Sequence, residues 1–400
     1  MKIGMILDKP FPPDPRVENE ALTLIDEGYE VFLFCLSYQR ETENEIYKGI
    51  QVRRYLSSAL EHKLSALSYT IPLYRIRLSK KIRNFLEVNE IDVVHIHDMV
   101  AGEAALSANK KFNLPVILDL HENRPEIMKY YPHLNKFPGK ILISPAKWSR
   151  KEGELVKKVA KTIVVTEESK KELVNRLGIS AEKIVVVPNT VKKSFYQNYE
   201  LDDSIVNRYK DVFVILYLGD TGLRRGLLSM IEAVDQMVKK QDLDKKIKLV
   251  IVGSNSSDHV LKNRVQELGI QEYVDFEGWQ EPKLFQSYLK VAQLGISPLH
   301  RNPHHDTTYA NKLFQYMSFG VPVLASDAQA QMHLIEKSHS GLIHRERDTN
   351  DIQNKILRLY KNEELARELG QNGKRFIEDK FSWERVSSEL KNLYLEFKSS

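Results

Sequence analysis

Cysteine, long apolar runs and excess charge are all scarce in this 400-residue sequence, and each scarcity excludes a class of protein. The one cysteine, Cys35, excludes an intramolecular disulfide and a multi-cysteine metal site, and it fits a reducing compartment. No segment approaches the roughly 18 consecutive apolar residues of a membrane-spanning helix. The opening MKIGMILDKPFPPDP does not resemble a signal peptide. The 59 basic and 54 acidic residues leave a net charge of +5, too small to indicate a nucleic-acid partner.

The length and the pattern of apolar runs predict two α/β domains. Four hundred residues are about twice what one hydrophobic core usually organises. Short β-branched runs alternate with helical patterns, which is typical of parallel, doubly wound sheets. The clearest runs are residues 2–7, 30–36, 92–97, 115–121, 162–166, 183–189, 213–219, 248–253 and 321–326. A polar stretch at 194–211 separates the two halves, and helical, charged sequence ends the chain.

The loop after the first strand of each half is where such domains usually bind ligands. In the first half it reads DKPFPPDPRV and lacks the glycines of a dinucleotide fingerprint, G-x-G-x-x-G. In the second half it reads GDTGLRRG, Gly219–Gly226, and its glycines would let the backbone approach a ligand closely. Arg224 and Arg225 would grip a diphosphate; an ordinary turn with solvated arginines is the alternative.

A second candidate ligand-binding segment is YANKLFQYMSFGVPVLASD, residues 309–327. It predicts a helix that begins near Asn311 and leads into a buried strand. The free amides at the N-terminus of this helix, together with Lys312, would face a ligand. Gln315 lies about one turn further along a mostly apolar helix, and it faces either the ligand or solvent.

Nine segments, in this order and spacing, resemble those of the large retaining family 4 of GT-B glycosyltransferases over essentially the whole chain. The segments are the opening strand with DPRVENEA and GYEV, HIHD at 95–98, DLHE at 119–122, VVVPNTV at 185–191, YLGDTGLRRG, IVGS at 251–254, FEGW at 276–279, QYMSFGVPVLASD and the terminal FSWE. The resemblance implies two Rossmann-like, doubly wound domains that face a central cleft, with the C-terminal helix returning to the first. The implied domains are residues 1–198 with 381–400, which would bind the acceptor, and residues 199–380, which would bind a nucleotide-diphosphate sugar.

The resemblance also implies roles for residues of the second domain. Arg225 resembles the family's diphosphate-binding lysine, and the amides near Asn311 and Lys312 resemble those that cradle the phosphates. Gly278 and Trp279 lie where the family holds the nucleobase. The donor-binding residues would be Gly219, Gly222, Arg224, Arg225, Gly278, Trp279, Thr307, Asn311, Lys312 and Gln315. UDP is favoured over GDP, and neither a cofactor nor a metal is implied.

Several positions depart from the family pattern. The two glutamates of its E-x7-E motif fall on Thr307 and Gln315. Gln315 can still hydrogen-bond ribose hydroxyls, whereas Thr307 cannot replace a carboxylate near the transferred sugar, and adjacent Asp306 would take that part. The family's loop arginine falls on Asp220, for which Arg224 would substitute. These changes keep an inactive relative as an alternative.

His121 is the principal candidate of the first domain. It ends a predicted strand and matches the family position that contacts the donor sugar near the reacting centre; a histidine hydrogen-bonded within its loop is the alternative. Together with Arg225 and Asp306 it forms the predicted catalytic set. Glu122 and His97 are expected to contact the acceptor, although a structural role for His97 is equally open.

A histidine-rich loop contains the ligand types of a metal site: His300, His304, His305 and Asp306. Consecutive histidines in one loop seldom all bind one ion. Donor or acceptor contact is therefore preferred for this loop, since it leads into the helix that begins near Asn311.

Two stretches of the first domain favour contact with an anionic membrane. Residues 62–86 carry six basic and no acidic residues, and residues 124–161 carry ten basic against three acidic residues. Aromatic and aliphatic residues are interleaved with these charges, as in segments that bind membrane surfaces. Solvated helix faces are the alternative. No recognition motif accompanies the charge, so nucleic acid is not indicated.

These observations predict a retaining glycosyltransferase of hexosyl or N-acetylhexosaminyl type. It would move a sugar from a nucleotide-diphosphate donor to a glycan or lipid-linked acceptor in cell-surface polysaccharide biosynthesis. It would act in the cytoplasm, at the inner face of the plasma membrane; retention is implied by the resemblance alone. A non-catalytic nucleotide-sugar-binding relative and a GT-B sugar-nucleotide epimerase are the alternatives.

Overall fold

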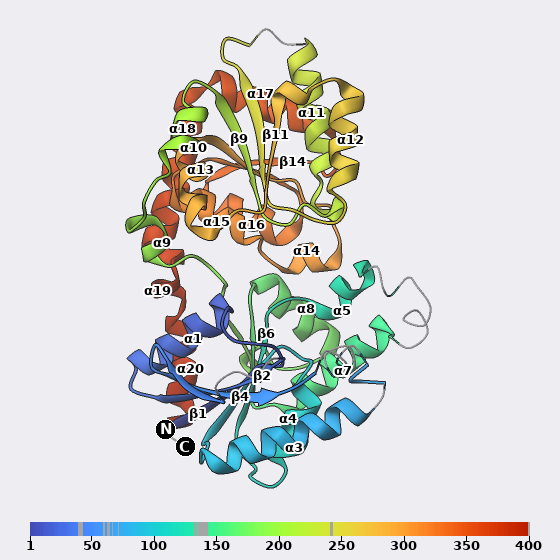
Figure 1. Ribbon diagram of the computed structural model, residues 1–400, viewed down its shortest axis with the longest axis vertical. Helices are drawn as coiled ribbons and strands as arrows, with labels where there is room; N and C mark the ends of the chain where they lie inside the picture. Colours follow the sequence, from blue (N-terminus) through green and yellow to red (C-terminus); the bar gives the residue numbers. More distant parts are fainter. Residues whose placement is uncertain are drawn as a thin grey trace. The chain divides into compact units, whose positions relative to one another are not determined.

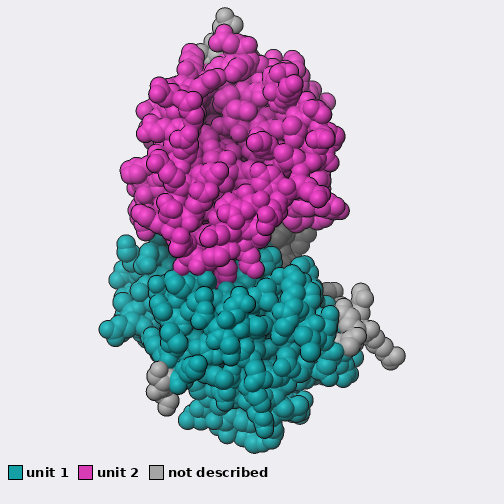
Figure 2. Space-filling model, turned by 90° about the vertical axis from the view of Figure 1, so that its left-hand side faces the viewer, with its two compact units in different colours: residues 1–188, 386–400 teal, residues 189–385 magenta. Residues whose placement is uncertain are grey.

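The computed structural model (Figure 1) describes residues 1–38, 43–58, 61, 65, 67–70, 72–131, 134, 143–240 and 243–398. The chain forms two compact units, residues 1–188 with 386–400 and residues 189–385, which Figure 2 colours separately. Both units are α/β, and the C-terminal segment belongs to the first, as the sequence predicts. The predicted domain boundaries, at 198/199 and 380/381, lie within ten residues of these divisions.

The first unit is built on an eight-stranded sheet in the order β3-β4-β2-β1-β5-β6-β7-β8, in which every neighbouring pair is parallel except β3 and β4. The strands are β1 (Lys2–Ile6), β2 (Glu30–Ser37), β3 (Asn44–Tyr47), β4 (Ile50–Leu56), β5 (Val93–His97), β6 (Val116–Leu120), β7 (Lys161–Val164) and β8 (Ile184–Val186). The described helices include α1 (Pro15–Asp26), α3 (Pro72–Val88), α4 (Gly102–Asn109), α5 (Arg124–Ile127), α7 (Pro145–Lys158), α8 (Glu167–Leu177) and α20 (Ser388–Lys398). Strand order reverses at β1, which pairs with β2 on one side and β5 on the other, and ligands of such sheets bind at this point.

Side chains of β5 and β6 alternate between two different environments. Val94, Ile96 and Leu118 enter a hydrophobic core that also contains residues of α3, α4 and α7. His95, His97 and Asp119, at the intervening positions, are fully buried on the opposite face, where α1 and α20 pack. Three polar side chains thus occupy positions that are usually apolar in strands buried on both faces.

The second unit contains a six-stranded parallel sheet in the order β11-β10-β9-β12-β13-β14. The strands are β9 (Phe213–Leu218), β10 (Ile247–Val252), β11 (Val274–Gly278), β12 (Ala292–Ser297), β13 (Val323–Ser326) and β14 (Gly341–His344). The helices are α9 (Lys193–Gln197), α10 (Asp203–Arg208), α11 (Leu227–Lys240), α12 (Asp258–Leu268), α13 (Phe285–Val291), α14 (Pro303–Thr307), α15 (Asn311–Ser318), α16 (Gln329–Ser338), α17 (Thr349–Lys361) and α18 (Glu363–Phe376), followed by α19 (Trp383–Val386), which leads into α20.

Both faces of this second sheet are covered, with α11 and α12 on one face and α10 and α13 on the other (Figure 1). Along β9, Ile215 and Tyr217 pack against the first pair, whereas Val214 and Leu216 join the core that contains α13 and α15. The strand order reverses at β9, between β10 and β12. The loop after β9 therefore lies at the ligand-binding edge of the sheet.

Candidate functional site

The loop after β9 is shaped by two glycines in the left-handed region. Gly219 has φ +113° and Gly226 has φ +80°. A Cβ atom on Gly226 would lie 1.7 Å from the carbonyl oxygen of Pro298, so only glycine fits there. The loop closes in a short 3-10 turn that contains Arg224 and Arg225, just before α11 begins.

Asp220 holds the two arginines of this loop. Its carboxylate accepts from Arg225 Nε at 3.1 Å and from Asn255 Nδ2 at 2.6 Å, and it lies 3.7 Å from Arg224 Nη2. Burial alone would raise the pKa of Asp220, but hydrogen bonds from Asn255 and Arg225 lower it. Asp220 is therefore ionised and fixes both guanidinium groups. The sequence indicated only that a family arginine is missing at this position.

Lys312 lies buried beneath the same loop, and only 7% of the residue is exposed. Its Nζ stands 3.5 Å from the centre of the Tyr217 ring, and its Cε would be 3.7 Å from a Cβ on Gly219. Burial and the charges of Arg225 and Arg224 hold the pKa of Lys312 well below its usual range. Burial and the neighbouring arginines disfavour the charged form of Lys312, and an anion bound beside it would favour that form.

His305, in the short helix α14, supports Arg224. Its Nδ1 donates to the carbonyl of His300 at 2.6 Å, which leaves Nε2 to accept from Arg224 Nη1 at 3.3 Å. Burial, with the charges of Arg225 and Arg224, lowers the pKa of His305 to about 3, so the ring is neutral. Among the described residues, the histidine-rich loop does not form a group of three or more side chains spaced to hold a metal ion.

The loop after β9 thus carries unbalanced positive charge. Arg224, Arg225 and Lys312 converge on it, and Asp220 is the carboxylate that contacts both arginines. The N-terminus of α15, whose first residues are Asn311 and Lys312, adds the positive end of a helix dipole, and its N-cap residue, Ala310, makes no side-chain capping bond. This combination of guanidinium groups, an ammonium and a helix N-terminus is suited to a diphosphate.

Three further predicted donor-site residues lie at the end of β11 and on α15. Gly278 has φ +66° at the end of β11, and the indole of Trp279 that follows is 69% exposed. Gln315 is half-buried on α15. An exposed indole beside the ligand-binding edge of a sheet provides a stacking surface for a flat ring.

Two predicted residues make hydrogen bonds within the second unit itself. The Asp306 carboxylate accepts from the backbone amide of Gln329, at the start of α16, and pairs with Arg301 at 3.4 Å. The Thr307 hydroxyl donates to the carbonyl of Pro303 at 2.7 Å, inside α14. Asp306 therefore caps a helix, which differs from the expectation that it replaces the family's first glutamate.

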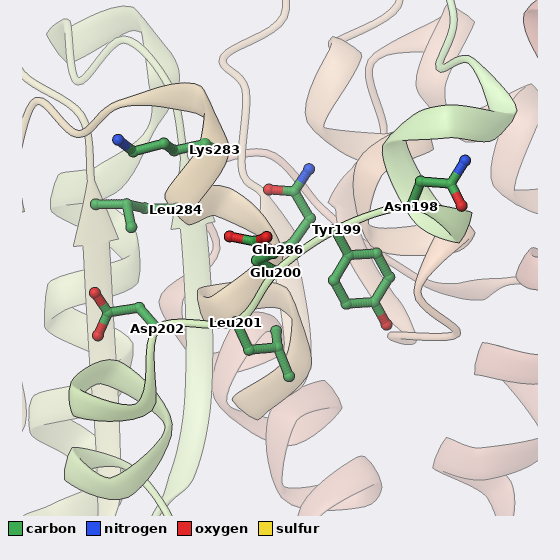
Figure 3. Close-up of a pocket in the computed structure, with 8 residues that line it drawn as sticks. All are labelled: Asn198, Tyr199, Glu200, Leu201, Asp202, Lys283, Leu284 and Gln286. Atoms are coloured by element: carbon green, nitrogen blue, oxygen red, sulfur yellow. The ribbon is translucent and has the colours of Figure 1, made fainter.

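A separate pocket of about 750 Å³ lies between the loop before α10 and the start of α13 (Figure 3). It is lined by Asn198, Tyr199, Glu200, Leu201, Asp202, Lys283, Leu284 and Gln286. Its only cation, Lys283, already pairs with Glu281 at 2.7 Å. Since Glu200 and Asp202 are both acidic, this pocket does not suit a diphosphate.

The first unit presents His121 at the carboxyl edge of its sheet, immediately after β6. The side chain is 18% exposed, and its Nε2 lies 2.8 Å from Asp119 Oδ2. The His97 ring lies underneath, with Nδ1 3.2 Å from the same His121 nitrogen. His97 itself is fully buried, which corrects the expectation that it contacts the acceptor.

Carboxylates gather beside His121 at the ends of the neighbouring strands. Asp98 follows β5, and Arg124 Nη1 pairs with Asp98 at 3.3 Å and with Glu122 at 3.4 Å. Asp8 follows β1; burial and the charge of Asp98 raise its pKa to about 6. Asp8 was not among the residues predicted from the sequence, although a carboxylate that directly follows a buried strand is a signal for such a site.

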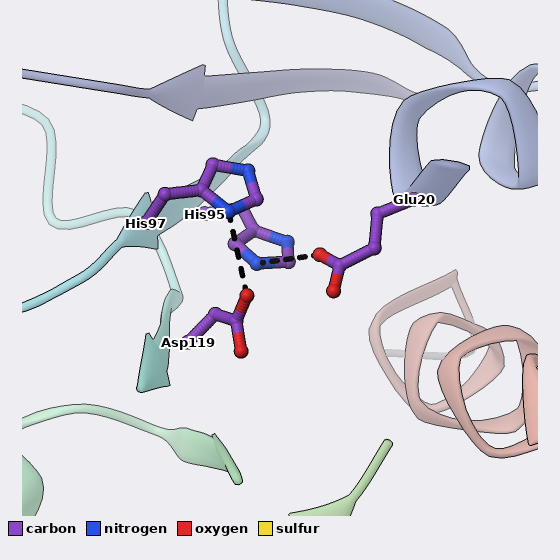
Figure 4. Close-up of side chains that lie close together, drawn as sticks. All are labelled: Glu20, His95, His97 and Asp119. Atoms are coloured by element: carbon purple, nitrogen blue, oxygen red, sulfur yellow. Dashed lines mark ion pairs between the residues drawn. The ribbon is translucent and has the colours of Figure 1, made fainter. Parts of the chain in front are cut away.

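Behind His121, four side chains form a fully buried cluster: Glu20, His95, His97 and Asp119 (Figure 4). Their candidate ligand atoms lie within 4.8 Å of one another. Arg16, however, donates to both Asp119 oxygens, at 2.8 and 2.7 Å, and its Nη2 lies 3.0 Å from Glu20. Because this guanidinium already supplies the positive charge, we do not assign a metal to the cluster.

Comparisons with known proteins agree on one kind of protein. Residues 198–376 match the family model described as glycosyl transferases group 1, and residues 16–195 match that of glycosyltransferase family 4. An uncharacterized glycosyltransferase of Methanocaldococcus jannaschii is 25% identical over 390 residues, 95% of this chain and 93% of its own. The capsular polysaccharide biosynthesis glycosyltransferase CapM of Staphylococcus aureus is 23% identical over 248 residues, 59% of this chain and 61% of its own.

Solved structures extend the likeness to the whole fold. Sucrose-phosphate synthase of Thermosynechococcus elongatus has a TM-score of 0.80 at 17% identity and covers 100% of both chains. HepE of Anabaena, in complex with UDP, has a TM-score of 0.72 at 14% identity and covers 99% of this chain and 100% of its own. At these identities the likeness shows the fold alone, and that fold is GT-B.

Proposed function

The chain belongs to the GT-B glycosyltransferases of the group 1 and family 4 kind, and on that premise we propose that it transfers a sugar, with retention of configuration, from a nucleotide-diphosphate donor. The proposed acceptor is a glycan or a lipid-linked glycan in cell-surface polysaccharide assembly at the cytoplasmic face of the membrane. The names of two similar proteins favour this assignment: one is a capsular polysaccharide biosynthesis enzyme, and the other was solved with UDP.

The observation that carries the proposal is the unbalanced positive charge after β9. As the bond from the anomeric carbon to the diphosphate breaks, negative charge grows on the departing oxygen. Arg225, Lys312 and the N-terminus of α15 would stabilise that charge. The acceptor oxygen forms the new bond to the anomeric carbon, and its proton leaves with the diphosphate. No protein nucleophile takes part, and Trp279 would stack on the uracil of a UDP donor.

The first unit would supply the acceptor side of the reaction. His121 would face the donor sugar. The carboxylates of Asp8, Asp98 and Glu122 can accept hydrogen bonds from the many hydroxyls of a glycan. Three carboxylates beside one arginine, Arg124, at a ligand-binding edge suit a neutral, hydroxyl-rich substrate better than a second polyanion.

The exposed face of α3 supports an acceptor that is presented by a membrane. Leu73 and Ile76 are 42% and 49% exposed, and Arg77, Lys80 and Arg83 follow them on the same exposed side. Parts of the two basic stretches, residues 62–64, 66, 71, 132–133 and 135–142, lie outside the described residues. Within the described part of the chain, no helix has the length and apolar character needed to cross a bilayer.

Nucleotide binding is the first test of the donor site. Thermal unfolding would be measured with UDP, GDP, ADP and CMP, and UDP is expected to stabilise most. Arg225→Ala should weaken UDP binding by about 10- to 100-fold, because a charged hydrogen bond contributes about 1.5–3 kcal/mol. Arg264→Ala is the matched control, since this arginine of the same unit pairs with Glu232 of α11 and Glu267 of α12, neither of which belongs to the predicted donor site.

The outcomes discriminate between functions. If no nucleotide stabilises the protein, the donor-site assignment is wrong. If UDP binds but no UDP-sugar is transferred or hydrolysed, the chain is a non-catalytic relative. That second candidate is favoured by one observation: Thr307 and Asp306, where the family has an acidic residue, are engaged in α14 and at the start of α16.

A further inference from the structure

The buried side chains behind His121 constrain where its protons lie. Asp119 Oδ2 is 2.8 Å from His121 Nε2, and Arg16 donates to both oxygens of the same carboxylate. Burial alone would raise the pKa of Asp119, but the charge of Arg16 and contact with His121 lower it well below its usual range. An ionised carboxylate only accepts hydrogen bonds. The His121 nitrogen that faces it must therefore carry a proton.

The contact between Asp119 and His121 is the outer end of a longer buried chain of polar groups. Arg16 Nη2 bridges Asp119 at 2.7 Å and Glu20 at 3.0 Å. Glu20 Oε2 lies 3.4 Å from His95 Nε2, a packing contact in which neither atom makes a hydrogen bond, and the other nitrogen of His95 is 2.7 Å from the hydroxyl of Tyr394. Burial raises the pKa of Glu20 well above its usual range and lowers that of His95, which favours the neutral form of both side chains.

The last of these buried polar groups, Tyr394, comes from a distant part of the sequence. Tyr394 is a fully buried residue of α20, which follows the whole second unit along the chain. Its ring packs against Tyr29 at 5.9 Å and His95 at 6.2 Å between ring centres. A buried phenol that reaches a buried histidine does more than fill space, because a phenylalanine would pack equally well.

We propose that Asp119 is a positioning residue that keeps a proton on Nε2 of His121, and that Glu20, His95 and Tyr394 tie this setting to the C-terminal helix. With that proton on Nε2, Nδ1 is left as the acceptor for a sugar hydroxyl. The arrangement follows the carboxylate–histidine pair of hydrolytic triads, in which the buried acid sets tautomer and orientation and is not itself protonated. The proposal rests on the proposed function only for the statement that His121 faces the donor sugar.

Nuclear magnetic resonance on the full chain tests the tautomer without any substrate. The protein would be labelled with ¹⁵N-histidine, and the His121 signal would be assigned by its loss in His121→Asn. We expect Nε2 to carry the proton in the wild type and the alternative tautomer to appear in Asp119→Asn. A wild-type His121 protonated only on Nδ1, or a tautomer unaffected by Asp119→Asn, would overturn the proposal. Circular dichroism checks that each variant is folded.

Milder variants keep the test decisive if Asp119→Asn fails to fold. Tyr394→Phe removes only the hydroxyl and should also populate the alternative tautomer, whereas Tyr29→Phe, its packing partner, should not. Glu20→Ala should do the same as Tyr394→Phe, with recovery in Glu20→Gln, which imitates the neutral acid. An unchanged His121 signal in Tyr394→Phe would refute the tie to α20.

Turnover of UDP-glucose as a probe separates this proposal from the proposed function. Asp119→Asn should lower kcat at least about tenfold while the KM for UDP-glucose stays within about threefold, because the loss lies in orientation and not in diphosphate binding. Absence of UDP binding together with the expected tautomer refutes the proposed function and leaves the positioning intact. Turnover that is unchanged in Asp119→Asn refutes the positioning alone.

Discussion

The clearest quantitative prediction concerns Asp8, the carboxylate that follows β1. Burial and the charge of Asp98 raise its pKa from 3.8 to about 6, so the folded state holds this proton more tightly than the unfolded chain. The penalty is absent below pH 4, grows as the pH rises toward 6 and is fully present above that. At 1.36 kcal/mol per pKa unit, the rise in the pKa of Asp8 from 3.8 to about 6 corresponds to at most about 3 kcal/mol. Partial exposure of Asp8 reduces this to about 1–3 kcal/mol.

Asp8→Asn removes the charge and keeps the shape, so it should stabilise the first unit at pH 7.5 and leave it unchanged at pH 4. In a domain of this size each kcal/mol shifts the melting temperature by about 2–4 °C. Differential scanning calorimetry at both pH values measures the shift for each unit, and Asp26→Asn, an exposed carboxylate of α1, is the control. Equal stabilisation at pH 4 and 7.5 would mean that packing, not charge, explains the effect. Destabilisation at pH 7.5 would mean that Arg124 more than compensates the burial of Asp8.

Three further predictions concern the second unit. Gly226→Ala should lower the unfolding free energy of the second unit by more than about 3 kcal/mol, because the new Cβ would lie 1.7 Å from the Pro298 oxygen. Gly269→Ala is the control: its Cβ meets nothing within 4 Å, so it should lower the unfolding free energy by only about 1 kcal/mol. Thermal unfolding measures both. Lys312→Met should raise the melting temperature at pH 7, because it removes a buried amine whose pKa is lowered by burial. The same variant should weaken UDP binding at least about tenfold, as measured by calorimetry. Unchanged affinity would mean that Lys312 does not contact the phosphates. Trp279→Ala should cost about 1–3 kcal/mol of UDP binding and abolish the fluorescence change on UDP addition, and a retained change would place the base elsewhere.

Local sequence signals predicted much of this fold. Asp14 and Pro15 predicted the start of α1, and the Asp14 side chain accepts from Val17 as an N-cap should. The helix expected near Asn311 begins at that residue. Buried parallel strands are written as apolar runs, so their positions follow from composition alone.

The buried charges could not be predicted in the same way. Arg16 and Glu20 are of residue types that are normally exposed, and the partner of Arg16, Asp119, lies 103 residues away. Lys312 was expected to face a ligand, but its burial over Tyr217 depends on how α15 packs against β9. For Asp306 the motif spacing fixed the position along the chain but not the helix that its carboxylate caps.

The position of α20 at the end of the sequence also determines when the first unit can complete its folding. The first unit consists of residues 1–188 and 386–400. Its sheet therefore lacks Tyr394 and the rest of α20 until the ribosome has synthesised the entire second unit. Domains usually fold as units in the order in which they are synthesised. Here the second unit is complete before the first, and the buried groups around His95 reach their final partners last. An enzyme assembled in this order acquires its full set of buried contacts behind His121 only once the donor-binding half exists.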